Sequence, residues 1–386
     1  MLTLALMMVQ AVPQIPSERP LSGDDNAQIV VNGESLGQTH AALDRCLAQH
    51  CAPDQDIRTT LRFADQQFLA GDYVAARLTV AAARRRNDRF AKTYPEPVSN
   101  LARAESRLAA LSGMPDVALK ASIDAIDALK AARPDNDPTT LMQRLEHGDQ
   151  YARAGDLKTA TAMYNKVAAQ ARRSGNVPVE AHALFRNAVL YAAVASVRPI
   201  YAERARAAVD RIQRRTEPGF APFKQGVTLL AARLALLDTK SADRGAALAT
   251  VAKVPLAEPV LLYDPFLDLQ RVGVSGTQTY SDRAEWADVG YRVKPDGSVG
   301  DVEVRAESQD KPGPWLAMKL QAVAGRRYAP FDVAPDAPGL YRVERYTMVY
   351  DKVQTTGSVI KVRSPYGRID TTALSTTYRA PVVAVK

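Results

Sequence analysis

The sequence predicts a multidomain protein in which an all-α solenoid of helical repeats is followed by a small α+β domain. Three observations support this fold class. The first two-thirds of the chain is rich in alanine and carries one local pattern three times at a fixed interval. A stretch with repeated prolines follows, over residues 254–283, where continued helix is disfavoured. From residue 284 onward, the apolar residues alternate with polar ones as in strands.

Length and charge agree with this division. The chain has 386 residues, and about 150 residues per domain gives two or three domains. The net charge is +8, but the basic residues come as scattered groups such as Arg84-Arg85-Arg86, with acidic residues between them. A nucleic-acid binder more often concentrates its basic residues on one element. We therefore expect solvated helix faces and no nucleic-acid partner, with a weak attraction to anionic envelope polymers or lipid as the alternative.

The chain begins with an apolar run over residues 1–11 that ends in Val9-Gln10-Ala11. The run is shorter than the roughly 20 residues that a membrane-spanning helix needs. Its small-residue end is typical of a signal-peptidase site. We expect a cleaved signal peptide over 1–11, a flexible lead-in over 12–38, no stable membrane span, and export to the periplasm of a Gram-negative envelope. A disordered apolar N-terminus is the alternative.

The two cysteines, Cys46 and Cys51, lie close together, and Pro53 indicates a break in the helix nearby. In an exported protein, two and only two cysteines indicate one disulfide bond. His40 and His50 are neighbours, but the Cys-x-x-Cys spacing of structural zinc sites is missing. We therefore expect a disulfide and neither a metal nor a cofactor, with unpaired thiols as the alternative.

The helical zone spans residues 39–253 and contains Gly71, Gly113 and Gly155 at an interval of 42 residues, each with matching neighbours. Glycine accepts the left-handed conformation that ends a helix, and an acidic residue after it favours the start of the next. A small alanine a few residues later lets the two helices approach closely. The pattern is similar to the hairpin of a tetratricopeptide repeat, although that repeat usually has about 34 residues. Stacked hairpins expose a concave groove that binds protein segments, whereas an irregular helical domain is the alternative.

Residues 284–353 predict the order β-β-α-β. The turn Pro295-Asp296-Gly297-Ser298 joins two alternating strands. A helix follows at about 314–326, with Leu316, Leu320 and Val323 on one stripe, and a third strand at about 340–353. The helix is expected to cover one face of the sheet. Residues 354–386 form a C-terminal extension with a further β-like stretch around Ile360.

The hairpin Val289–Val304, with its Pro-Asp-Gly turn, and the sequence Arg327-Tyr328-Ala329-Pro330 after the helix resemble the TonB C-terminal domain family. The resemblance implies that an extended peptide from an outer-membrane partner is captured by strand addition. It makes the strand 341–350 the edge and places Arg345, Thr347 and Val349 near the added peptide. The alternative is that the C-terminal extension occupies this edge, which would protect it from aggregation.

Motifs for catalysis are not evident, and we expect no catalytic residues. His147 and His182 are isolated on predicted helices, His147 on the surface, and Trp286 and Trp315 read as core packing. We therefore predict an exported envelope protein that acts as a protein–protein interaction module, with envelope or outer-membrane protein segments as partners. One alternative is a TonB-type energy transducer for outer-membrane transport, although the membrane helix and Pro-rich spacer of those transducers are not seen here. Another is an enzyme whose site is built from scattered residues.

Overall fold

The computed structural model describes residues 34–238, 260–267, 269, 284–308, 313–331, 338–354 and 361–374. Its first part is a row of α-helices, and its second part is a small antiparallel sheet with one helix. The predicted succession of a helical part and an α+β part is confirmed. The predicted signal peptide and most of the predicted lead-in lie outside the described residues.

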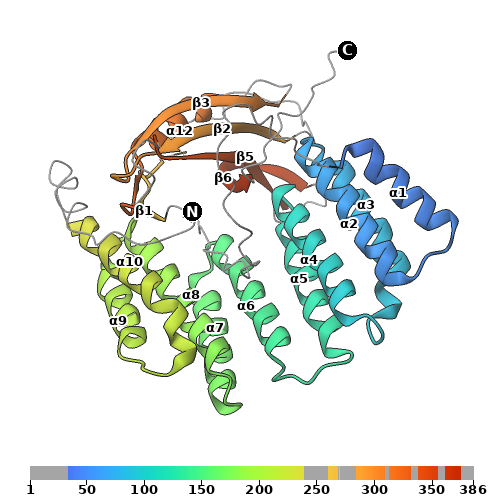
Figure 1. Cartoon of the computed structure of the whole chain (residues 1–386), viewed down its shortest axis with the longest axis horizontal. Helices are drawn as coiled ribbons and strands as arrows, with labels where there is room; N and C mark the ends of the chain where they lie inside the picture. Colours follow the sequence, from blue (N-terminus) through green and yellow to red (C-terminus); the bar gives the residue numbers. More distant parts are fainter. Residues whose placement is uncertain are drawn as a thin grey trace, which may run out of the picture.

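The helices stack side by side in an arc, from the blue α1 to the yellow α10 (Figure 1). Proline occupies the first turn of several of them, where its missing N–H breaks no helical hydrogen bond. The helices are α1 (Leu36–Ala48), α2 (Pro53–Leu69), α3 (Tyr73–Asn87), α4 (Pro95–Leu111), α5 (Pro115–Lys130), α6 (Pro138–Arg153), α7 (Leu157–Arg173), α8 (Val177–Ala195), α9 (Ala202–Gln213) and α10 (Ala221–Asp238), with 3₁₀ turns η1 (Asp88–Phe90), η2 (Pro199–Tyr201) and η3 (Pro218–Phe220).

The three aligned glycines end α2, α4 and α6, as the sequence predicts. Gly71, Gly113 and Gly155 have φ angles of +83°, +67° and +81°, a left-handed conformation that glycine adopts without steric cost. Asp72 and Asp156 then cap α3 and α7, because their side chains accept N–H groups of the first turn. The alanines five residues after each glycine are buried, namely Ala76, Ala118 and Ala160. Each turn therefore reverses the chain at the same point of a hairpin.

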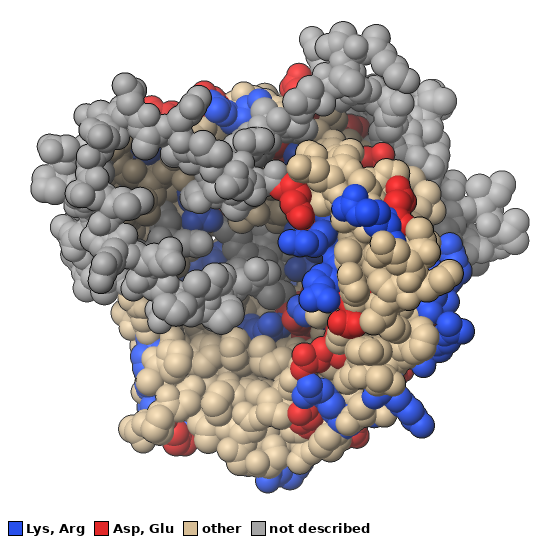
Figure 2. Space-filling view, turned by 45° about the vertical axis from the view of Figure 1, so that its right-hand side comes forward, with Lys and Arg blue, Asp and Glu red and all other residues tan. Residues whose placement is uncertain are grey.

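Charged side chains of both signs are distributed over the helical array. On the face in Figure 2, lysines and arginines lie among aspartates and glutamates rather than in a separate patch. Some arginines of the helical array are not simply solvated. Arg84 of α3 is largely buried and forms ion pairs with Glu105 of α4 and Asp124 of α5. Ion pairs therefore join consecutive helices where the sequence suggested only solvated faces.

The sheet has the strand order β3-β2-β5-β6, and every neighbouring pair is antiparallel. The predicted order β-β-α-β is present, and the predicted Asp-Gly turn joins β2 to β3, with Gly297 at φ +81°. The C-terminal extension adds one more strand to this sheet. The elements are β2 (Glu285–Val293), β3 (Val299–Glu307), α12 (Trp315–Ala324), β5 (Leu340–Gln354) and β6 (Lys361–Leu374).

Part of the segment predicted as a linker belongs to the folded structure. Strand β1 (Leu261–Tyr263) pairs with the short β4 (Arg327–Tyr328) in a separate two-stranded sheet. Leu262 of β1 is buried in a cluster with Leu229 and Leu236 of α10 and with Ala329. This small cluster attaches the α+β part to the far end of the helical array.

The sheet spans the arc of helices (Figure 1). One face carries α12, with a core that includes Tyr291, Trp315 and Tyr346. Trp286 of β2 and Val349 of β5 belong instead to the core of helices α2 to α5. Both faces of the central strands are therefore buried, one under α12 and one on the helical array. Among the described residues, no helix is long and apolar enough to cross a membrane.

Candidate interaction site

The three residues predicted to lie beside an added peptide are not at an open edge. Strand β5 pairs with β2 on one side and with β6 on the other. Arg345, Thr347 and Val349 are only 1%, 1% and 2% exposed. The expected open edge at 341–350 is thus corrected, and the alternative, in which the C-terminal extension covers this strand, describes the structure. The reason is that the extension pairs along nearly the whole of β5.

Arg345 attaches the sheet to the helical array at the turn between α2 and α3. Its guanidinium forms a two-pronged ion pair with Asp288 of β2, at 2.6 and 2.8 Å. It also donates to the carbonyl oxygens of Phe68 and Leu69, each at 2.9 Å, at the C-terminal end of α2. The ring of Trp286 lies 3.9 Å from the guanidinium carbon. A buried cation is thus matched by a carboxylate, the negative end of a helix and an aromatic face.

These partners stabilise the charged form of Arg345. Burial works to lower the pKa of Arg345, but the hydrogen bonds and negative charge of Asp288 outweigh it and raise the pKa. Thr347 adds a buried hydrogen bond, since its Oγ1 lies 3.0 Å from the Tyr73 hydroxyl at the start of α3. These side chains act as internal contacts between the two parts of the protein.

A second attachment lies one repeat further along. The N–H of Lys352 donates to the carbonyl oxygen of Gly113 at 2.7 Å. Arg368 of β6 donates to the carbonyl oxygen of Ala110 at 2.8 Å, and pairs with Asp351 at 3.3 Å. Ala110 precedes Gly113 by three residues, as Phe68 precedes Gly71. An arginine of the sheet therefore contacts the equivalent helix end in two successive hairpins.

A buried ionic network holds the other side of the sheet. Arg326, which follows α12 and is fully buried, donates to Glu344 at 2.7 Å and to Asp264 at 2.9 Å. The Tyr291 hydroxyl accepts from Arg326 at 3.1 Å, and the Tyr346 hydroxyl donates to Glu344 at 2.6 Å. Burial works to raise the pKa of Glu344, but the charge of Arg326 dominates and lowers it to about 2. The network joins the residues after β1 to α12 and β5.

The two outer strands of the described sheet differ in regularity. Strand β3 pairs with β2 through two register shifts, and Asp301 within it has φ +51°. Such bulges and left-handed residues hinder further pairing. Strand β6 pairs with β5 without interruption from Gly367 to Leu374. Among the described strands, none pairs with the other side of β6. The regular edge of the sheet is therefore β6, one strand further out than the sequence suggested.

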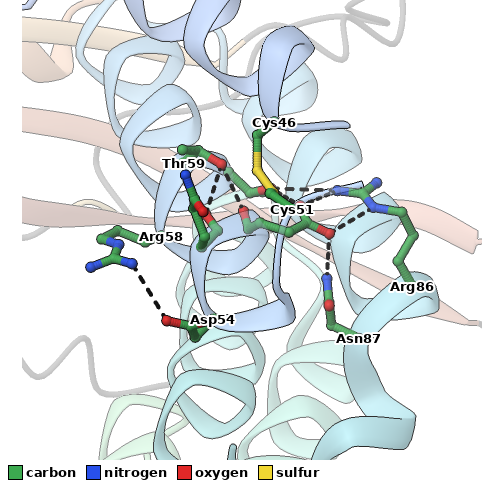
Figure 3. The surroundings of a disulfide bond; sticks show 10 residues. Cys46, Cys51, Asp54, Arg58, Thr59, Arg86 and Asn87 are labelled. Atoms are coloured by element: carbon green, nitrogen blue, oxygen red, sulfur yellow. Dashed lines mark hydrogen bonds and ion pairs between the residues drawn. A yellow bond between two sulfur atoms is a disulfide. The ribbon is translucent and has the colours of Figure 1, made fainter. Parts of the chain in front are cut away.

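The predicted disulfide is present between Cys46 and Cys51. Their Cα atoms are 5.1 Å apart, and the bond joins the end of α1 to the residues before α2 (Figure 3). The chain turns back at His50, whose φ is +49°. Among the described residues, no group of three or more His, Cys, Asp or Glu side chains is arranged to hold a metal ion.

The remaining residues singled out by sequence occupy packing positions. Trp286 and Trp315 are buried, as predicted. His147, predicted on a helix surface, is buried instead, and its Nδ1 lies 2.7 Å from the Ser122 hydroxyl. Burial lowers the pKa of His147, and it also lowers the pKa of His182, whose ring packs against Phe223.

Sequence reasoning missed the role of Trp286 and Asp288 in joining the two parts. The sequence does contain an indication of this role. Strand β2 includes Trp-Ala-Asp-Val-Gly-Tyr, in which polar residues do not alternate regularly, as is typical of a strand buried on both faces. No protein-family model matches the chain, and no curated protein matches its sequence.

Proposed function

We propose that this chain is an exported protein of a Gram-negative envelope that binds segments of other envelope proteins. In this proposal the helical hairpins are of tetratricopeptide type, and the sheet is of TonB C-terminal type. The sheet captures an extended segment of an envelope or outer-membrane protein by strand addition. The helical array holds the sheet in place through the arginine contacts described above.

The observation that carries the proposal is the regular edge of β6. Eight consecutive residues, Gly367 to Leu374, keep one register with β5. Residues 367–372 and Leu374 are partly exposed and Ala373 is exposed, so the strand is accessible. An antiparallel strand turns the N–H and C=O groups of alternate residues away from its partner. An incoming segment would bond to these groups, as in other cases of strand addition.

The family resemblance also supports strand addition, but at β6 instead of β5. The order β2, β3, α12, β5, with the short β4 before β5, and the Pro-Asp-Gly turn support the proposal of a TonB-type sheet. In that pattern β5 would receive the peptide, but here β6 already pairs with it. The proposed site of addition is therefore the next position outward in the sheet.

Export is supported by the disulfide, since such bonds persist in oxidising compartments. Mature protein isolated from the periplasm is expected to lack residues 1–11 by intact mass, and its cysteines are expected to resist thiol labelling until a reductant is added. A full-length mass with both thiols labelled would contradict the export part of the proposal.

Site-specific photocrosslinking in intact cells tests the binding mode. A benzoylphenylalanine at Ala373, on the edge of β6, is expected to yield a defined adduct with an envelope protein. The matched control is the same group at Val304, which is 39% exposed on the bulged β3 strand at the opposite edge. Adducts from Ala373 alone support strand addition at β6. Absence of adducts from Ala373, or identical adducts from both sites, argues against it.

A further inference from the structure

The side chains of β6 form two rows, one on each face of the sheet. Ile369 contacts the core under α12, which places the odd-numbered residues from 367 to 373 on that face. The even-numbered residues, Arg368, Asp370 and Thr372, lie on the face toward the helical array, where Arg368 reaches Ala110. A segment added along β6 would place its own side chains beside these two rows.

Asp370 is the acidic member of the row that faces the helices. Its neighbour Arg368 is already engaged by Asp351 and by the Ala110 carbonyl oxygen. Asp370 instead accepts the N–H of Thr371 at 3.0 Å. This bond marks Thr371 as one of the alternate residues whose N–H points away from β5. The carboxylate of Asp370 therefore caps a backbone group that an added strand needs.

We infer that the segment captured at β6 carries a lysine or arginine beside Asp370, between apolar or β-branched residues that lie beside Ile369 and Thr371. This inference rests on the proposed function and specifies its ligand. The arriving cation attracts the Asp370 carboxylate, and the N–H of Thr371 becomes available to a carbonyl oxygen of the added segment. With a neutral residue at this position, the Asp370 carboxylate still competes with the segment for the N–H of Thr371. An acidic residue at this position adds charge repulsion with Asp370.

The test uses the full chain and three labelled peptides that differ at one position. Each has the form Thr-Val-Thr-Val-Xaa-Val-Thr-Val, with Xaa as lysine, alanine or glutamate, and binding is measured by fluorescence anisotropy. The lysine peptide is expected to bind about threefold more tightly than the alanine peptide and about tenfold more tightly than the glutamate peptide. The preference should shrink at high salt, because exposed charges are screened.

Two variants of Asp370 separate its charge from its cap. Asp370→Asn keeps an oxygen for the Thr371 N–H but removes the charge, and Asp370→Ala removes both. Both are expected to lose the preference for lysine, and Asp370→Ala is expected to bind the alanine peptide at least as well as the natural chain. The matched control, Glu303→Ala on β3, should keep the preference.

The outcomes distinguish the inference from the proposed function. Failure of all three peptides to bind would overturn strand addition at β6 itself. Equal binding of the three peptides would leave strand addition standing and overturn the role of Asp370. A lysine preference that persists in both Asp370 variants would also overturn that role.

Discussion

The guanidinium carbon of Arg345 lies 3.9 Å from the centre of the Trp286 ring, and the indole of Trp286 also packs against the turn at Gly71. The sheet and the hairpin of α2 and α3 thus meet through this cation–π contact. The arginine also satisfies two carbonyl groups at the end of α2. Two parts of the chain that are more than 270 residues apart are joined in this way.

Removal of Arg345 should destabilise the whole protein. Arg345→Ala removes one member of the buried ion pair with Asp288, and such a loss costs about 3–5 kcal/mol. Denaturant unfolding measures the change in free energy of unfolding. Arg305→Ala, on the exposed strand β3, is the control and should cost less than about 0.5 kcal/mol. Equal effects of the two substitutions would refute the role of Arg345.

Gly113 should be far less tolerant of a side chain than Gly175, although both have positive φ. A Cβ at Gly113 would collide with the backbone carbonyl of Tyr350, whereas a Cβ at Gly175 meets nothing within 4 Å. Gly175→Ala should cost about 1–2 kcal/mol from backbone strain alone. Gly113→Ala should cost at least about 1 kcal/mol more, because the contact with β5 must also open. Thermal unfolding of the two variants provides the comparison, and equal losses would show that the second attachment is weak.

Stability should fall in acid through Glu344. Its pKa is lowered to about 2 by Arg326, so its contribution is fully present above the usual value near 4.5 and is lost as the pH falls toward 2. The Glu344→Gln variant is expected to be less stable at pH 7 and to show a flatter decline between pH 5 and pH 2. Urea unfolding at several pH values measures this slope. An unchanged slope in the variant would remove Glu344 from the explanation.

Reduction of the disulfide should destabilise the N-terminal end of the array. The disulfide closes a short loop, because the two cysteines are 5 residues apart, and a short loop limits the stabilisation. In the chain-entropy description, closing this loop stabilises the fold by about 2 kcal/mol. The double variant Cys46→Ser/Cys51→Ser should match the natural chain in the presence of reductant. If reductant lowers the stability of the double variant as well, the effect does not come from this bond.

Much of the fold was predictable because local chemistry determines it. The glycines at 71, 113 and 155 end helices through their backbone conformation, and Gly297 with its neighbours makes the turn between β2 and β3. The disulfide followed from two nearby cysteines together with the expectation of export. Each of these features depends on residues that are close in sequence.

The contact between the two parts was not predictable in the same way. In the sequence, Arg345 resembles an outward-facing polar residue of a strand. It is buried only because the distant C-terminal end of α2 and the side chain of Asp288 surround its guanidinium. Arg326 and Glu344 likewise depend on each other and on Asp264, which lies in a stretch that reads as linker. The displacement of the open edge from β5 to β6 has the same origin, because pairing of β6 depends on tertiary context.

Hydrogen–deuterium exchange of the full chain, with and without the lysine peptide, tests strand addition at β6 most directly. Added backbone hydrogen bonds should slow the exchange of the amides in residues 367–374, while those in residues 299–307 of β3 keep their rates. Protection confined to β3 or to the helical hairpins, or no protection at all under saturating peptide, would contradict the account.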